Sequence, residues 1–220
     1  MLKYPCLVLD HDDTVVASEV AVNYPCFLLA LEKFRPGQTM DLESFRHWCY
    51  QPGFPALLLE KFQFTPQEAE EEFRMWVEYA KDHIPPVYDG IRDLIWEQKR
   101  QGGLVCVVSH SSRETILRDY ETHIGLLPDA IYDWNLPKEQ RKPSPWPLRD
   151  IMAKYGLSPA QMLVVDDLKT GVEMAANAGV QCAFAGWSKQ DLPQVHRDMS
   201  KICHHCFDTV TQLREFLFGS

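Results

Sequence analysis

The sequence lacks any apolar run near the roughly 20 residues that a membrane-spanning helix requires, which argues against an integral membrane protein. It contains no internal repeat and no low-complexity tract, which argues against repeat architectures and disordered tails. It also lacks a dense Lys/Arg cluster, and its 22 basic residues are outnumbered by 31 acidic ones, for a formal net charge of −9. Nucleic acids and anionic membranes are bound through basic patches, so we expect neither as the main partner.

The seven cysteines are an odd number, in a chain that is neither short nor secreted in appearance, and this argues against a disulfide framework. No apolar signal segment precedes the first expected strand. We therefore expect a cytoplasmic protein with free thiols. A length of 220 residues allows one domain, or one domain carrying an insertion.

A short apolar run, Leu7–Leu9, ends in three closely spaced acids, of which Asp10 and Asp12 are two residues apart. Such a run is typical of a strand buried on both faces of a parallel sheet. Residues at the carboxyl ends of parallel strands face the ligand crevice in open α/β sheets. The two acids could divide nucleophilic and acid–base work. Alternatively, the stretch is only an acidic turn after a strand.

From residue 88 onward, strand and helix patterns alternate, which predicts βαβ units and a parallel sheet. Helices are expected to stop at Gly102, Gly156 and Gly179, and Ser111 with Glu114 forms an expected capping box. Strands are expected at 104–109, 130–132, 162–165, 182–184 and 206–207.

Residues 15–87 have a helical character instead. Thr65 with Glu68 forms a capping box, further helices are expected at 24–31 and 42–48, and 51–55 must be a turn. The fold class is therefore a doubly wound, Rossmann-like α/β core, residues 1–14 and 88–220, with an inserted α-helical cap at 15–87. Because the insertion leaves the sheet edge that carries the acids, we expect it to act as a lid.

Polar groups follow several of the expected strands: Asp10, Asp12, Ser109, Lys142, Asp166 and Asp167. If they converge, the carboxylates repel one another by about 4 kcal/mol per pair at 4 Å and an effective dielectric of 20. A positive charge is needed among them, and oxygen ligands with room for water suit Mg²⁺. Lys142, just before a helix, adds a second positive charge where a phosphate would bind. This pattern predicts a phosphoryl-transfer site.

The same residues give the chain a resemblance to the haloacid dehalogenase (HAD) superfamily phosphatases that have a helical cap inserted after the first motif. Asp10–Glu19 matches the opening DxDGTLxDSE, and Ser109 stands where the second motif ends its strand. Lys142–Pro145 matches the third motif, KPxP. Asp166–Gly179 matches the acidic fourth motif, (E/D)DSxxGxxAAxxAG. Four motifs in the right order cover essentially the whole core.

The resemblance implies a two-step displacement. Asp10 attacks phosphorus to give an aspartyl-phosphate, and Asp12 protonates the leaving oxygen and later activates water. It also implies a Mg²⁺ held by Asp10, the backbone carbonyl of Asp12 and Asp167, with Asp166 either a direct ligand or one step removed.

The resemblance further assigns Ser109 and Lys142 to the phosphoryl oxygens, and Thr14 to the turn that orients Asp12. The implied enzyme is a HAD-like phosphatase acting on a small phosphorylated metabolite. Three positions depart from the motifs: Asp13 replaces the usual Gly, Ala17 a common Asp, and His110 a frequent Asn. Asp tolerates unusual backbone angles better than most residues, so we expect the turn to survive.

Alternatives remain. A sugar phosphomutase of the beta-phosphoglucomutase type would use the same Asp10 and Asp12 and return the phosphate to a sugar. A dehalogenase needs neither Asp12 nor magnesium and is disfavoured. A phospho-accepting signalling or binding module also pairs acids with a hydroxyl and a Lys, but signalling receivers are shorter and lack the insertion.

Two further patterns have an ordinary structural interpretation. The run Cys203–Cys206, with two histidines between the cysteines, looks like half of a zinc site, but structural zinc needs four ligands. We expect buried strand residues there. In the predicted cap, a solvated helix face is expected for the residues that carry charged or large polar groups: Arg46, His47, Trp48, Lys61 and Arg74.

Overall fold

The structure is a computed structural model in which residues 2–219 are described. The chain divides into two compact units. The core unit is formed by the chain up to Val16 and from Pro86 onward, and the helical unit by Ala17–Pro85. The corresponding junctions expected from the sequence are at 14 and 88.

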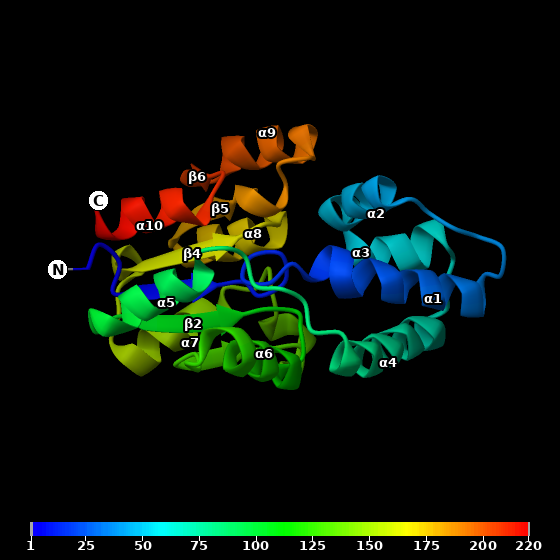
Figure 1. The fold of residues 1–220 in the computed structure, drawn as a ribbon, viewed down its shortest axis with the longest axis horizontal. Helices are drawn as coiled ribbons and strands as arrows, with labels where there is room; N and C mark the ends of the chain where they lie inside the picture. The colour runs from blue at the N-terminus through cyan, green and yellow to red at the C-terminus, as the bar shows by residue number, and fades with distance from the viewer. Residues whose placement is uncertain (1, 220) are drawn as a thin grey trace. The chain divides into compact units, whose positions relative to one another are not determined.

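The core unit contains a six-stranded, fully parallel sheet in the order β3-β2-β1-β4-β5-β6 (Figure 1). Every predicted strand is present, with bounds that differ by no more than one residue at either end. The strands are β1 (Cys6–Leu9), β2 (Leu104–Val108), β3 (Ala130–Tyr132), β4 (Met162–Asp166), β5 (Gln181–Ala185) and β6 (His205–Phe207).

Helices flank this sheet (Figure 1). They are α5 (Ile91–Arg100), α6 (Arg113–Asp119), α7 (Trp146–Tyr155), α8 (Lys169–Ala178), α9 (Pro193–Ile202) and α10 (Val210–Phe218). Helices α5 and α10 contact each other, as do α7 and α8. Every residue of β1 and β4 is buried, as expected for continuous apolar strands of a covered parallel sheet. The predicted α/β fold class is confirmed.

The register of the central strands sets the position of the site. Leu9, the last residue of β1, lies beside Val107 of β2 and Val165 of β4. The residues that follow these three strands therefore emerge at one edge of the sheet.

The helical unit contains α1 (Tyr24–Phe34), α2 (Leu42–Trp48), α3 (Phe54–Ala56) and α4 (Pro66–Asp82). Its core is an apolar cluster in which Phe27 and Phe45 pack with ring centroids 5.0 Å apart. The predicted capping box of Thr65 and Glu68 is present. The predicted turn is a break in the helix before α3, with extended backbone at Gln51.

Two parts of the sequence interpretation were incomplete or wrong. Helices α9 and α10 were not predicted, although Thr209 and Gln212 form a capping box that marks the start of α10. The expected cap at Ser111 was wrong, because Ser112 caps α6 and accepts a hydrogen bond from the Thr115 backbone N–H at 3.2 Å. The Ser111 hydroxyl instead contacts Asp12.

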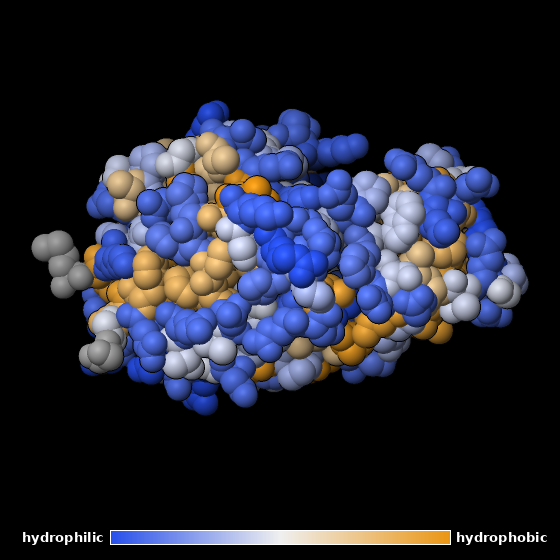
Figure 2. Space-filling model, turned by 90° about the horizontal axis from the view of Figure 1, so that it is seen from above, coloured by the Kyte–Doolittle hydropathy of each residue, from blue (hydrophilic) through white to orange (hydrophobic). Residues whose placement is uncertain are grey.

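The surface and the thiols follow the expectations from composition. Polar residues cover most of the face that Figure 2 shows, with smaller apolar patches between them. Within residues 2–219, no helix combines the length and apolarity needed to cross a bilayer. All seven cysteines are free thiols, as predicted.

Candidate active site at the carboxyl ends of the central strands

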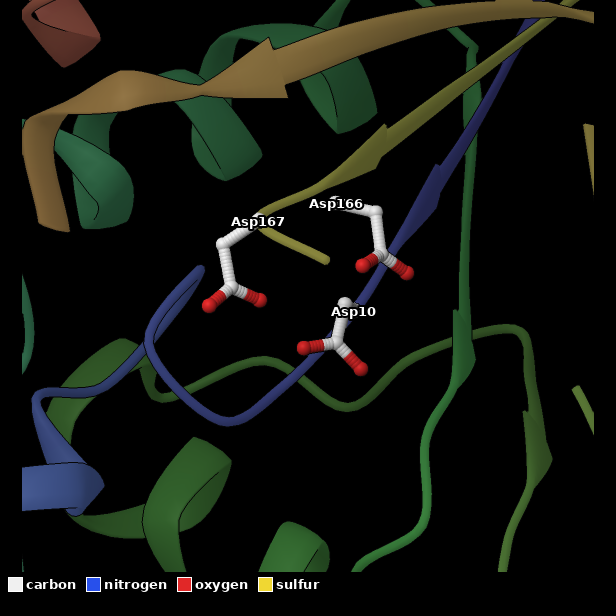
Figure 3. Close-up of side chains that lie close together, drawn as sticks. All are labelled: Asp10, Asp166 and Asp167. Atoms are coloured by element: carbon white, nitrogen blue, oxygen red, sulfur yellow. The ribbon is translucent and has the colours of Figure 1, made fainter. Parts of the chain in front are cut away.

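Three carboxylates meet at the edge that the strand register defines. Asp10 directly follows β1, Asp166 is the last residue of β4, and Asp167 comes next. All three are buried, and each offers an oxygen within 4.8 Å of those of the other two. Figure 3 shows the three side chains close together. The Asp10 backbone N–H donates to the Val165 carbonyl at 2.9 Å, which ties the end of β1 to β4.

Lys142 supplies a positive charge among the carboxylates, as the sequence analysis expected. Its Nζ lies 2.6 Å from Asp10 Oδ1 and 2.9 Å from Asp166 Oδ2, and the lysine is buried. Burial raises the pKa values of Asp10 and Asp166 above their usual range, and Lys142 opposes this. Burial also disfavours the Lys142 ammonium, but the two carboxylates outweigh it and raise its pKa. The geometry therefore favours a charged lysine shared by two acids.

Asp166 is held on both sides. Its Oδ1 accepts a hydrogen bond from the Leu168 backbone N–H at 2.9 Å, and its Oδ2 accepts from Lys142. Gly171 leaves room for it, because a Cβ at that position would lie 2.0 Å from Asp166 Oδ2. Asp166 thus orients Lys142, whereas Asp167 has a different basic partner.

That partner is Lys189, which follows the turn after β5. Its Nζ lies 3.0 Å from Asp167 Oδ2, and both side chains are 3% exposed. The sequence interpretation missed this residue. The available signal was its position, because the loop after β5 emerges at the same edge of the sheet as the acids.

Asp12 is more exposed than Asp10 and is held by serine hydroxyls. Ser111 donates to Asp12 Oδ2, and Ser109 Oγ lies 3.5 Å from the same oxygen. The Ser111 backbone N–H also donates to Ser109 Oγ at 3.1 Å, so both serines belong to one network. The structure thus brings together the side chains of Asp12 and Ser109, which are two of the predicted site residues. Ser111, the third member of this network, was not predicted from the sequence.

The loop between the two catalytic candidates is anchored by His11. Its fully buried ring lies 3.0 Å, Nε2 to Oδ2, from Asp119 of α6. Asp13 adopts φ 54°, a left-handed conformation that Gly favours and Asp tolerates better than most residues. The turn therefore survives the Gly-to-Asp departure from the motif.

Thr14 is buried in the same loop. Its Oγ1 has no hydrogen-bond partner among the described residues, and its carbonyl accepts from Trp187 Nε1 at 3.2 Å. The orienting role assigned to Thr14 stays a prediction.

The acidic cluster fits a hard divalent cation. Asp10, Asp166 and Asp167 offer only oxygen atoms, and these are close enough to share one ion. Oxygen ligands are those that Mg²⁺ prefers. Among the described residues this is the only group of three or more His, Cys, Asp or Glu side chains so arranged.

The expectation of buried strand residues at Cys203–Cys206 is wrong, because only His205 and Cys206 lie in β6 and neither is buried. In the former zinc half-site, His204 Nδ1 accepts from the Cys182 backbone N–H at 3.2 Å, and His205 Nε2 lies 3.1 Å from Gln181 Oε1. In the helical unit, the expectation of a solvated face is wrong for Arg46, which is buried and lies 2.8 Å from Glu19 Oε2.

The remaining candidates of the helical unit are divided. Lys61 and Arg74 are exposed as expected. The expectation of a solvated face is partly wrong for Trp48, because it packs against the apolar cluster of the unit. His47 is only partly exposed.

The family model for haloacid dehalogenase-like hydrolases matches residues 7–185. The chain therefore belongs to this family, and the predicted class, a phosphatase-like hydrolase, is confirmed.

Its relatives carry phosphatase names. The chain is 28% identical over 196 residues to the phosphoglycolate phosphatase of Pseudomonas putida, covering 81% of this chain and 68% of that one. It is 24% identical over 191 residues to the pyrophosphatase PpaX of Bacillus velezensis, covering 84% and 85%. Among solved structures, CbbY of Rhodobacter sphaeroides, in complex with xylulose-1,5-bisphosphate, matches with a TM-score of 0.74 at 18% identity. That match covers 97% of this chain and 96% of that one.

Proposed function

We propose that the protein is a Mg²⁺-dependent phosphatase that hydrolyses the phosphomonoester of a small metabolite through an aspartyl-phosphate on Asp10. The observation that carries the proposal is the placement of buried Lys142 between Asp10 and Asp166, beside Asp167. A buried ammonium beside a carboxylate keeps that carboxylate ionised, which is the state a nucleophile needs. The phosphatase names of the relatives support the same chemistry.

In the first step, an Asp10 oxygen forms a bond to phosphorus and the bond from phosphorus to the substrate oxygen breaks. Asp12, in its acid form, gives its proton to that leaving oxygen. In the second step, water attacks phosphorus while Asp12 takes a proton from it, and the bond from phosphorus to Asp10 breaks. Inorganic phosphate leaves, the Asp10 carboxylate is regenerated and Asp12 is again protonated.

The remaining residues bind and orient. Lys142 neutralises Asp10 and binds a phosphoryl oxygen, and Ser109 donates to another. Thr14 supports the turn that carries Asp12. The Ser111 hydroxyl, which contacts Asp12, orients the acid–base group.

Mg²⁺ would be held by Asp10, the backbone carbonyl of Asp12 and Asp167. Asp166 would be either a direct ligand or one step removed from the ion. When bound, the ion supplies positive charge against the phosphoryl oxygens. The three clustered carboxyl groups of Asp10, Asp166 and Asp167 support this assignment.

The substrate is proposed to be a small phosphorylated metabolite of the cytoplasm. Phosphoglycolate and a sugar bisphosphate appear in the names of a relative and of a structural neighbour, respectively. The helical unit, inserted in the chain directly after the first motif, is proposed to act as the lid that selects the substrate. Free thiols, as found at all seven cysteines, are typical of a reducing compartment.

The test is release of inorganic phosphate from a panel of phosphoglycolate, sugar phosphates, pyrophosphate, nucleotides and an aryl phosphate. Each assay is run with Mg²⁺ and with a chelator. Asp10→Asn removes the nucleophile, and Asp89→Asn is the matched control because Asp89 is exposed in the same unit. We expect metal-dependent turnover that is lost in Asp10→Asn and kept in Asp89→Asn.

Turnover that survives in Asp10→Asn would contradict the covalent mechanism. Turnover that is unchanged by the chelator would contradict the metal. Labelling of Asp10 by a phosphoryl donor, without release of phosphate from any substrate, would favour the phosphomutase instead.

A further inference from the structure

Lys189 is a second buried lysine at the acidic edge, and none of the four motifs assigns a role to it. It lies just after the short helical turn Gly186–Ser188 that follows β5, and its backbone N–H donates to the Gly186 carbonyl at 3.0 Å. Its Nζ contacts Asp167 Oδ2 at 3.0 Å. Lys189 therefore occupies one oxygen of a carboxylate that the proposed function assigns to the metal.

Asp13, which departs from the first motif, lies close to the pair of Lys189 and Asp167. Asp13 stands where the family pattern has Gly, and it is buried. The Tyr88 hydroxyl donates to Asp13 Oδ1 at 3.2 Å. Burial raises the pKa of Tyr88, the Asp13 carboxylate raises it further, Lys189 lowers it and Asp167 raises it. The charges of Asp13, Lys189 and Asp167 thus all lie near one tyrosine ring.

Asp13 and Lys189 add one negative and one positive charge to the site. Without them, Asp10, Asp12, Asp166 and Asp167 face Lys142, and a divalent cation offsets most of the excess negative charge. With them, the sum of charges is the same, but one carboxylate of the metal set already has a cation at 3.0 Å. A divalent ion approaching Asp167 must displace this ammonium or share the carboxylate with it, and it is repelled by the ammonium in either case.

We propose that Lys189 is a positioning residue that acts as an internal counter-ion of Asp167 and weakens the affinity of the site for divalent cations. It holds Asp167 in place before the metal arrives, and it competes with the metal for the same carboxylate. The inference rests on the divalent-cation site of the proposed function.

The experiment measures Mn²⁺ binding to the metal-free protein by the loss of the free-ion electron paramagnetic resonance signal, and Mg²⁺ by competition with it. The variant is Lys189→Met, with Lys189→Arg as the variant that keeps the charge. Lys138→Met is the matched control, because Lys138 is exposed in the same unit. Lys189→Gln, which keeps a donor toward Asp167, replaces Lys189→Met if the latter does not fold.

We expect Lys189→Met to bind Mn²⁺ at least tenfold more tightly than wild type, with Lys189→Arg and Lys138→Met unchanged. Equal or weaker binding by folded Lys189→Met or Lys189→Gln, beside a wild type that binds, would overturn the inference while leaving the proposed function intact. Failure of the wild type itself to bind Mn²⁺ or Mg²⁺ would overturn both the metal site and the inference. Binding, unlike turnover, separates this role from a purely structural one.

Discussion

Both units of the chain bury ion pairs, but the helical unit also buries a carboxylate that lacks a cation. In the core unit, Asp10 and Asp166 share buried Lys142, and Asp167 has buried Lys189. In the helical unit, buried Glu19 pairs with Arg46.

Buried Glu72 of α4 has no such partner. Among the described residues, no basic group and no hydrogen-bond donor contacts it, and burial alone raises its pKa to about 7.

The comparison distinguishes buried carboxylates that have a cation beside them from a buried carboxylate that has none. A buried carboxylate without a partner takes up a proton near neutral pH, because the low dielectric disfavours its ionised form. A carboxylate beside a buried lysine can stay ionised, at the cost of burying the lysine as well. The core unit bears that cost twice at one sheet edge, at Lys142 and at Lys189.

The largest effect is expected for Lys142→Met, which leaves Asp10 and Asp166 buried side by side without their cation. Removing one member of a buried ion pair costs about 3–5 kcal/mol of stability. Loss of electrostatic stabilisation at a reacting group lowers turnover by about 10²–10³-fold. Urea unfolding and phosphate release from the best substrate of the panel measure the two effects.

Lys138→Met is the control for that change and should leave both properties unchanged, because Lys138 is exposed. If Lys142→Met kept more than a tenth of wild-type turnover, the core unit would not depend on its buried cation, and the contrast between the units would lose its functional meaning.

Arg46→Met tests the corresponding pair in the helical unit. It leaves Glu19 buried, so we expect a loss of about 3 kcal/mol in the free energy of unfolding. The double variant Arg46→Met/Glu19→Gln removes the uncompensated charge and should recover part of that loss. A double variant no more stable than Arg46→Met would show that the arginine stabilises the unit through packing rather than charge. Urea unfolding of the three proteins provides the measurement.

These pairs also mark the limit of what the sequence could predict. The sheet and most helices follow from short apolar runs and from glycine and capping signals, which act over a few residues. Asp10, Lys142 and Asp166 could be placed together because strand ends of a parallel sheet meet at one edge. Arg46, by contrast, looks solvated on its helix until its partner Glu19, 27 positions away in the chain, is known.

Two further misses have the same origin. Ser111 and Ser112 are adjacent hydroxyls, and the sequence does not show which of them caps α6 and which turns toward Asp12. A single lysine after an expected strand, as at Lys189, resembles any surface lysine. Ser111 contacts Asp12 and Lys189 contacts Asp167. Both partners are distant in the sequence, so no local sequence pattern predicts these contacts.

Glu72→Gln sharpens the contrast through pH. The folded protein holds the Glu72 proton up to about pH 7, whereas the unfolded chain loses it near 4.5. The stabilising contribution of this group is therefore fully present below pH 4.5 and is lost as the pH rises through 7. The difference corresponds to about 3 kcal/mol at most. We expect Glu72→Gln to match wild type near pH 4.5 and to exceed its stability at pH 8.

Urea unfolding at pH 4.5, 6 and 8 measures this difference. Glu70→Gln is the control, because Glu70 is exposed on the same helix, and its stability should follow that of wild type at each pH. A Glu72→Gln variant less stable than wild type at pH 8 would mean that the ionised carboxylate has a partner in solution, and the contrast with the core unit would disappear.

The smallest effect is expected where the two units are alike. Thr65 in the helical unit and Thr209 in the core unit each cap a helix through a capping box, accepting from a backbone N–H at 3.2 Å in both cases. Loss of such a cap costs about 1 kcal/mol, so Thr65→Ala and Thr209→Ala should destabilise the protein by similar amounts. Urea unfolding compares them. Equal losses would show that local helix chemistry is the same in the two units and that their difference lies in buried charge, whereas a loss several times larger in one unit would locate part of the difference in its helices.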